Sequence, residues 1–129
     1  MIRQQLLFRE VDGERTPDIC GIAVDLINPD TVPSARGSLA VIYIEPGRKS
    51  SRHYHKVTEE VYYFLEGFGC VVVEGEEITV EAGSAVYIPI GRVHQVSNTS
   101  PSLPLRFLSI DTPAFDVTDV FPSNGAVPA

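Results

Sequence analysis

The stretch GRKSSRHYHKVTEEVYYFLEG, residues 47–67, carries two of the three histidines of this 129-residue chain. His53 and His55 are separated by one residue, and side chains at alternate positions of an extended strand point to the same face, with Cα atoms roughly 6.5 to 7 Å apart. Two imidazoles placed in this way can bind one metal ion. Glu59 and Glu60 follow after a short turn, so one of these carboxylates can face back toward the histidines.

The segments around this stretch have the pattern of short β-strands. Each is rich in Val, Ile, Tyr and Phe and is bounded by Gly, Pro or acidic turn residues. The expected strands are LAVIYIEP (39–46), EVYYFLEG (60–67), GCVVVEG (69–75), EEITVEAG (76–83), SAVYIPIG (84–91) and LPLRFLSID (103–111). No segment keeps apolar residues at helical spacing for three turns. The predicted fold class is therefore all-β, with mostly antiparallel strands in a sandwich or barrel.

The two ends of the chain are less regular. CGIAVDLI (20–27) predicts a strand, but NPDTVPSARG (28–37) has the composition of a loop, so the place of residues 1–38 in a sheet stays open. The tail predicts at most one helical turn, at residues 116–119. The acidic hairpin VVVEGEEITV, with its turn near Gly75, is predicted to be a solvated sheet edge.

Composition indicates a single folded domain over residues 1–129, because 43% of the residues are hydrophobic and 21% are charged. The net charge of −7 disfavours nucleic acid and anionic membrane surfaces as partners. No apolar run has the length of a membrane span or of a signal peptide, so a cytoplasmic location is expected. Cys20 and Cys70 lie fifty residues apart without a CxxC motif. They are expected to be small buried apolar side chains without chemistry.

The spacing of the opening stretch and of GSAVYIPIGRVHQVSN (83–98) resembles the two motifs of the cupin family. The ten motif positions, all present and in order, are Gly47, His53, His55, Glu60 and Gly67 followed by Gly83, Pro89, Gly91, His94 and Asn98. Such a match should arise by chance in fewer than roughly one in a million chains of this composition. The resemblance covers residues 47–98 by motif and about 39–111 by strand pattern.

The resemblance implies a small single-domain cupin, a double-stranded β-helix or jelly-roll barrel. The core barrel is expected over about 39–111, with an N-terminal strand or arm at 1–38 and a C-terminal tail at 112–129. The implied metal ligands are His53, His55, Glu60 and His94. The motif spacing selects Glu60 rather than Glu59, which a register slip of one residue would select instead. A homodimer is also implied, with the N-terminal segment pairing across the interface.

Two further groups of residues are candidates for the substrate pocket. Alternation places Tyr62 and Phe64 on the same inward face as Glu60, where they either line the pocket or fill the core of the barrel. Four of the chain's ten cations lie beside the predicted ligands, and they are Arg48, Lys49, Arg52 and Lys56. Arg48 and Arg52 are expected to attract a carboxylate or phosphate. Alternatively these cations point outward, because they flank inward-pointing histidines.

Three imidazoles and a carboxylate suit a divalent transition metal ion, one of Fe, Mn, Ni, Co, Cu or Zn, rather than Ca or Mg. The resemblance implies a metal-dependent enzyme that transforms a small oxygenated organic molecule, an anionic one if the cations recruit it. Dioxygenase chemistry is slightly favoured over redox-neutral isomerase, epimerase, cyclase or lyase chemistry, and Glu60 is the candidate proton carrier. The alternative is a sensor or storage protein that binds metal and a small molecule without turnover.

Overall fold

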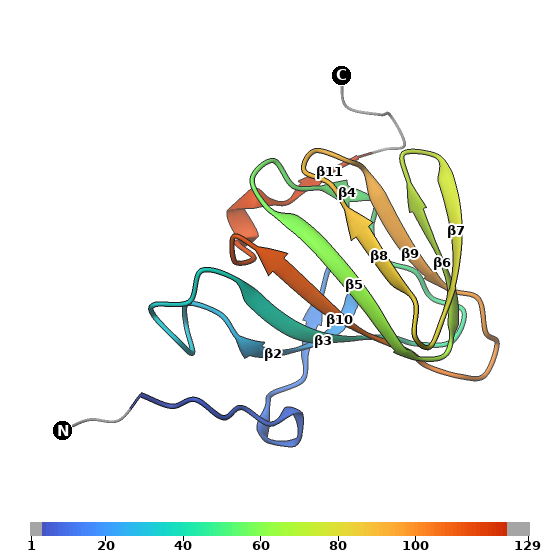
Figure 1. Cartoon of the computed structure of the whole chain (residues 1–129). Helices are drawn as coiled ribbons and strands as arrows, with labels where there is room; N and C mark the ends of the chain where they lie inside the picture. The colour runs from blue at the N-terminus through green and yellow to red at the C-terminus, as the bar shows by residue number, and fades with distance from the viewer. Residues whose placement is uncertain (1–3, 124–129) are drawn as a thin grey trace.

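The computed structural model describes residues 4–123 and arranges them in two β-sheets that face each other (Figure 1). One sheet has the strand order β1-β2-β3-β10-β5-β8, and the other has the order β11-β4-β9-β6-β7. The strands of the first sheet are β1 (Thr16–Asp18), β2 (Gly21–Ile27), β3 (Ser38–Ile44), β10 (Leu105–Thr112), β5 (Glu59–Glu66) and β8 (Ala85–Ile88). The strands of the second sheet are β11 (Phe121–Pro122), β4 (His53–Tyr54), β9 (His94–Asn98), β6 (Phe68–Val73) and β7 (Glu76–Glu81). The strand pairings are antiparallel, which confirms the predicted fold class.

The helical content of residues 4–123 is limited to two 3₁₀ turns, η1 (Glu10–Asp12) and η2 (Val117–Asp119). The turn η2 lies in the tail where the sequence predicts one helical turn, and the Asp116 side chain accepts a hydrogen bond from the Thr118 amide at its start. The turn η1 was not predicted. Over the described residues, no helix has the length and apolarity needed to cross a bilayer.

Each of the six predicted strands overlaps an observed strand, and residues 21–27 of the segment 20–27 form β2. The region that the sequence leaves open forms the β1–β2 hairpin, which extends the larger sheet beside β3. The acidic hairpin turns between Val73 and Glu76, and β7 is an edge strand, as predicted. The strand β4 covers only the first two residues of the extended segment expected at His53 and His55. The strands β1, β9 and β11 were not predicted, because pieces of two to five residues carry too little periodic pattern.

The hydrophobic core lies between the two sheets and follows from alternation along the strands. In β5, Tyr62 and Phe64 are fully buried, whereas Tyr63 between them is 40% exposed. The ring of Phe64 lies 4.9 Å from the ring of Phe107 in the neighbouring β10. The opposite sheet contributes the buried side chains Val71, Val80 and Val96. Burial of these apolar surfaces, at about 25 cal/mol per Å², is the main force that holds the sheets together.

The inward faces of the strands change from apolar to polar along the barrel. In β10, the buried Leu105 and Phe107 are followed on the same face by Ser109 and Asp111. The register with β5 places Asp111 opposite Glu60. One end of the barrel is therefore an apolar core, and the other end holds the buried polar groups of the candidate site.

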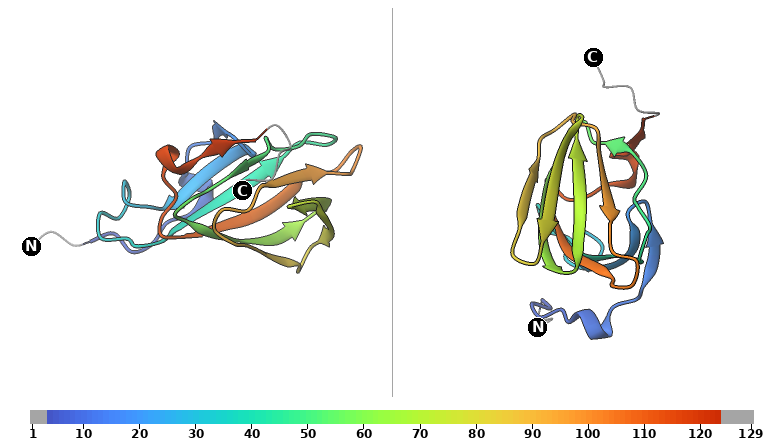
Figure 2. Two further views of the ribbon diagram at one scale, coloured as in Figure 1. Left: turned by 90° about the horizontal axis from the view of Figure 1, so that it is seen from above. Right: turned by 90° about the vertical axis from the view of Figure 1, so that its right-hand side faces the viewer.

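The N-terminal segment lies outside the two sheets (Figure 2). Glu10 of η1 forms an ion pair with Arg106 of β10, which ties the segment to the larger sheet. Before this point, Leu6 is 82% exposed and Leu7 is 61% exposed. These two apolar side chains are thus available for contacts beyond their own barrel.

Gly67 connects β5 to β6 at a position that requires glycine for two reasons. Its φ is +92°, and a Cβ atom there would lie 2.4 Å from the carbonyl oxygen of Pro104. Gly75 offers a matched control, because its φ is +84° but a Cβ atom would meet nothing within 4 Å.

We predict that Gly75→Ala lowers the free energy of unfolding by about 1 to 2 kcal/mol, the cost of a left-handed backbone. Gly67→Ala should lower the free energy of unfolding by about 1 to 3 kcal/mol more than Gly75→Ala does, because the methyl group forces the neighbouring backbone at residues 104 and 105 to move. Urea denaturation of the two variants and the wild-type protein measures both values. Equal losses would contradict the steric argument.

Candidate metal centre

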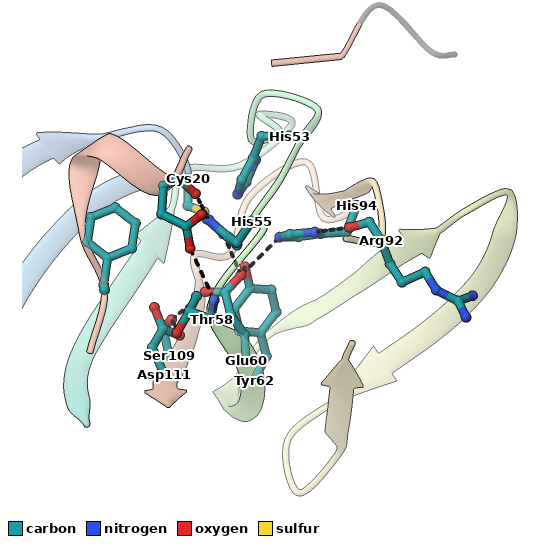
Figure 3. A network of polar contacts seen from close by, with 12 residues as sticks. Cys20, His53, His55, Thr58, Glu60, Tyr62, Arg92, His94, Ser109 and Asp111 are labelled. Atoms are coloured by element: carbon teal, nitrogen blue, oxygen red, sulfur yellow. Dashed lines mark hydrogen bonds and ion pairs between the residues drawn. The ribbon is translucent and has the colours of Figure 1, made fainter. Parts of the chain in front are cut away.

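Four buried side chains converge at the polar end of the barrel. His53 comes from β4 and lies opposite His94 of β9, His55 follows β4, and Glu60 belongs to β5. Each of the four is at most 3% exposed. One ligand atom from each lies within 4.8 Å of all the others, so the cluster could hold a metal ion. Figure 3 shows the rings directed toward Glu60, whereas the Arg92 side chain points away.

A backbone carbonyl fixes the proton of each imidazole. The Nδ1 atoms of His53, His55 and His94 lie 2.9, 2.8 and 2.9 Å from the carbonyl oxygens of Ser51, Asp119 and Arg92 respectively. A carbonyl can only accept, so Nδ1 donates and carries the proton. The lone pair of each ring is therefore on Nε2, which is the atom directed into the cluster and which has no hydrogen-bond partner in the described residues. Three aligned lone pairs are the donor set of a transition-metal site.

The Glu60 carboxylate completes the cluster. Its Oε1 atom lies 2.9 Å from Nε2 of His55 and 3.0 Å from Nε2 of His94. With the ring protons on Nδ1, these contacts bring lone pairs together, and a cation or an additional proton between them is needed to make them attractive. Burial, together with the nearby His94 ring, lowers the pKa of His53 to about 4, so this ring is neutral near pH 7 and able to act as a ligand. The donors present therefore fit a divalent transition metal ion.

Glu59 lies on the other side of its strand. It is half-buried, and its carboxylate accepts a hydrogen bond from the Tyr87 hydroxyl. The structure thus brings Glu60 to the histidines and leaves the register alternative, Glu59, outside the cluster.

The C-terminal tail supports the loop that carries His55. The Asp119 carboxylate accepts hydrogen bonds from the backbone amides of Lys56, Val57 and Thr58, at distances from 2.8 to 3.2 Å. The Asp119 carbonyl accepts the bond from His55 Nδ1 described above. One residue of η2 therefore fixes both the orientation of a predicted ligand and the turn that follows it.

A second carboxyl group lies beside Glu60. Burial, followed by the charge of Glu60, raises the pKa of Asp111 to about 9, so Asp111 is protonated near pH 7. The Ser109 hydroxyl lies 3.2 Å from both Glu60 Oε2 and Asp111 Oδ1, and it can donate its one proton to either of them. On the other oxygen, Oε1, Glu60 accepts a hydrogen bond of 3.1 Å from the Tyr62 hydroxyl. The site thus contains a linked pair of acids, one charged and one neutral.

A cavity of about 380 Å³ opens onto this cluster. Its walls come from the β1–β2 turn, the loop after β2, the inner face of β3, the end of β10 and the segment before η2. His53, His55 and Glu60 lie among its lining residues. The cavity is large enough for a small organic molecule next to the predicted ligands.

The structure does not bring the other predicted pocket residues into the lining of this cavity. Tyr62 lies behind Glu60 and is fully buried, and Phe64 fills the core against Phe107. Arg48 is exposed and borders a second hollow, which shares only residues 18–20 with the first. Arg52 is exposed and borders neither. These placements agree with the alternatives of core filling and outward-pointing cations.

Sequence reasoning missed several residues at the site. Asp111, Ser109 and Asp119 lie beyond the second motif, and no spacing signal marks them. Cys20 is buried as expected, but it also lines the cavity. Cys70 is only half-buried, because it alternates with the inward-facing Val71 of β6.

Comparisons with known proteins place this site in a recognised domain. A family model described as a cupin domain matches residues 40–111. The chain is 32% identical over 95 residues to the uncharacterized protein MJ1618 of Methanocaldococcus jannaschii, with 74% of this chain and 75% of that protein covered. It is 33% identical over 73 residues to the tetracenomycin polyketide synthase protein TcmJ of Streptomyces glaucescens. This second match covers 57% of the chain and 49% of TcmJ, so the chain spans about half the length of that relative.

A solved structure has a similar fold. The polyketide cyclase RemF from Streptomyces resistomycificus superimposes with a TM-score of 0.76 at 22% sequence identity. The superposition covers 92% of this chain and 84% of the RemF chain. At this level of identity the similarity shows the shared fold.

We predict that Asp119→Ala weakens metal binding without removing a predicted ligand. Three buried or half-buried amides lose their acceptor, so the free energy of unfolding should fall by about 2 to 4 kcal/mol. Release of His55 should lower metal affinity about 10- to 100-fold. Competition with a chromophoric chelator measures the affinity, and urea denaturation measures the stability.

Asp12→Ala is the matched control, because this exposed carboxylate of η1 lies outside the cavity lining and its side chain has no hydrogen bond or ion pair among residues 4–123. It should leave both quantities within experimental error. An Asp119→Ala protein with wild-type metal affinity would show that the tail does not position His55.

Proposed function

The chain belongs to the cupin domain family, and from this premise we propose that it is a metal-dependent enzyme that transforms a small oxygenated organic molecule by redox-neutral chemistry. The reaction class is isomerisation, cyclisation or elimination, in which a proton moves but no electrons are transferred to oxygen. The observation that carries this proposal is the pair of linked carboxyl groups, Glu60 and Asp111, at the base of the cavity.

The proposed ligands of the divalent ion are His53, His55, Glu60 and His94. Their support is the convergence of three unpartnered Nε2 atoms and one carboxylate within 4.8 Å. The chemistry that a bound ion supplies in such a site is Lewis-acid polarisation of a substrate oxygen. Fe, Mn, Ni, Co, Cu and Zn are all compatible with the donors.

The protein's own contribution to the reaction is proton transfer. Glu60 holds the negative charge and Asp111 holds a proton, so one carboxyl group can accept a proton from the substrate while the other returns one. The Ser109 hydroxyl lies within hydrogen-bond distance of both and can relay the proton between them. Tyr62 keeps Glu60 in position from the core side. The similarity to TcmJ and RemF supports redox-neutral chemistry, since RemF is described as a polyketide cyclase and cyclisation is one of the proposed reaction classes.

Dioxygenation is the second candidate function, and the ligand set itself favours it. Three histidines and one glutamate resemble the ligands of cupin dioxygenases. The two candidates differ in their use of oxygen, because only dioxygenation consumes it. A metal-containing sensor or storage protein without turnover is the remaining alternative.

We predict that protein reconstituted with a single divalent ion turns over small hydroxy and oxo compounds at the same rate in air and under argon. The measurement is metal analysis followed by product detection and an oxygen electrode for each ion. Oxygen uptake in proportion to product would favour dioxygenation instead. Tight binding without product, for every ion and compound, would favour the binding protein.

Variants of the acid pair sharpen the same test. Asp111→Asn should keep the metal and lower kcat at least about 100-fold, because the amide cannot return a proton. Ser109→Ala is the matched control, with a smaller loss because water can replace the hydroxyl. Normal turnover in a Glu60→Gln variant that keeps its metal would exclude Glu60 as the proton carrier.

We also propose that the protein is a homodimer in which the N-terminal segment contacts the second copy. The exposed side chains of Leu6 and Leu7 support this arrangement. Size-exclusion chromatography with light scattering should give a dimer at micromolar concentration, and Leu6→Ser with Leu7→Ser should shift it to monomer. A monomeric wild-type protein would contradict the proposal.

A further inference from the structure

The cavity above the predicted ligands has an acidic wall. Five of the seven aspartates of the chain line it, in addition to Glu60. They are Asp18 at the end of β1, Asp25 of β2, Asp30 of the following loop, Asp116 before η2 and Asp111 of β10, the last of which is protonated near pH 7 as described above. Among the described residues, the lining contains neither lysine nor arginine.

The protein does not neutralise these carboxylates with its own cations. The arginine ion pairs among residues 4–123 join Arg92 to Glu74 and Arg106 to Glu10, away from the cavity. The cations of the first motif are exposed on other segments. Partial burial of the Asp25 carboxyl group, followed by repulsion from the charge of Asp30, raises the pKa of Asp25.

A second observation identifies this space as a ligand site independently of its charge. His53 and His55 line the same cavity, and both are at least nine-tenths buried. Their Nε2 atoms have no hydrogen-bond partner in the described part of the chain and are directed into the cluster at the base. The cavity therefore has a coordinating base and a negatively charged wall.

We propose that this cavity selects a substrate that carries a protonated amine as well as a coordinating oxygen, and that it rejects carboxylates and phosphates of the same size. The oxygen lies at the base beside His53 and His55, and the ammonium group lies against Asp25 and Asp30. This inference rests on the proposed function of the same site and names its substrate class. It differs from the anionic substrate that the cations around Arg48 and Arg52 suggest.

The physical reason is that a carboxylate in this cavity would face the like charges of the wall, whereas an ammonium group would be attracted to them. Asp25 and Asp30 are exposed at the wall and make no side-chain hydrogen bond or ion pair within residues 4–123. Their carboxylates are thus available to a ligand. They are specificity-determining residues that can be changed to asparagine without loss of a structural contact.

The test uses three catechols that share one coordinating head and differ only in the charge of the side chain. Dopamine is cationic, 4-methylcatechol is neutral and 3,4-dihydroxyphenylacetate is anionic at pH 7. Calorimetric titration of the zinc-loaded protein under argon gives each dissociation constant without any turnover. We expect dopamine to bind at least about tenfold more tightly than 3,4-dihydroxyphenylacetate, with 4-methylcatechol between them.

The double variant Asp25→Asn with Asp30→Asn should reduce the preference for dopamine over 3,4-dihydroxyphenylacetate to about threefold or less. Its dissociation constant for 4-methylcatechol should equal that of the wild-type protein. Glu76→Gln with Glu77→Gln is the matched control, because it removes the same two charges from the distant edge strand β7. It should preserve the wild-type ratio. If both double variants lower the preference for dopamine equally, the preference comes from the net charge of the protein, and the inference is overturned.

Tighter binding of 3,4-dihydroxyphenylacetate than of dopamine by the wild-type protein would also overturn it, as would failure of all three catechols to bind zinc-loaded protein. The proposed function is tested separately. If the order of affinities holds but no compound is turned over, the enzyme proposal fails and the charge selectivity stands. If turnover occurs but the order is reversed, only the charge selectivity fails.

Discussion

The convergence of three imidazole nitrogens on the Glu60 carboxylate is the constraint on which the polar end of the barrel depends. The Nε2 atoms of His55 and His94 lie 2.9 and 3.0 Å from the same carboxylate oxygen. Backbone carbonyls hold the ring protons on the opposite nitrogens, so lone pairs face one another in a buried space. Such an arrangement favours whatever cation lies between them. The backbone around the rings therefore helps to set this arrangement of lone pairs.

The surrounding fold explains how these groups can be buried at all. Polar side chains at the ends of β5 and β10 lie next to an aromatic core, and the register that pairs Phe64 with Phe107 also pairs Glu60 with Asp111. A slip of one residue would turn the side chains of both pairs to the outer face of the sheet. The packing of the core and the geometry of the site therefore depend on the same register. The tail adds a second requirement, because Asp119 must fold back to satisfy three amides beside His55.

The sequence predicted that His53, His55, Glu60 and His94 come together, because the spacing of the two motifs implied it. Alternation gives His53 and His55 one face, and the motif spacing distinguishes Glu60 from Glu59. Asp119 could not be found in this way, since its partner Lys56 lies 63 residues away in the chain and the contact depends on the path of the tail. The same holds for Asp18 and Asp25, because the place of the β1–β2 hairpin beside β3 is set by long-range pairing that leaves no periodic signal.

The charge of the cavity illustrates the same distinction. The cations beside the histidines are close in sequence, but a residue next to an inward-facing side chain points to the opposite face, and Arg52 is accordingly exposed. The wall is built instead by segments before and after the motifs, residues 18–30 and 109–117. Proteins that share the motif can therefore share the coordinating base and differ in the charge of the wall above it. The segments outside the motifs, rather than the motifs themselves, therefore set the charge of the cavity wall.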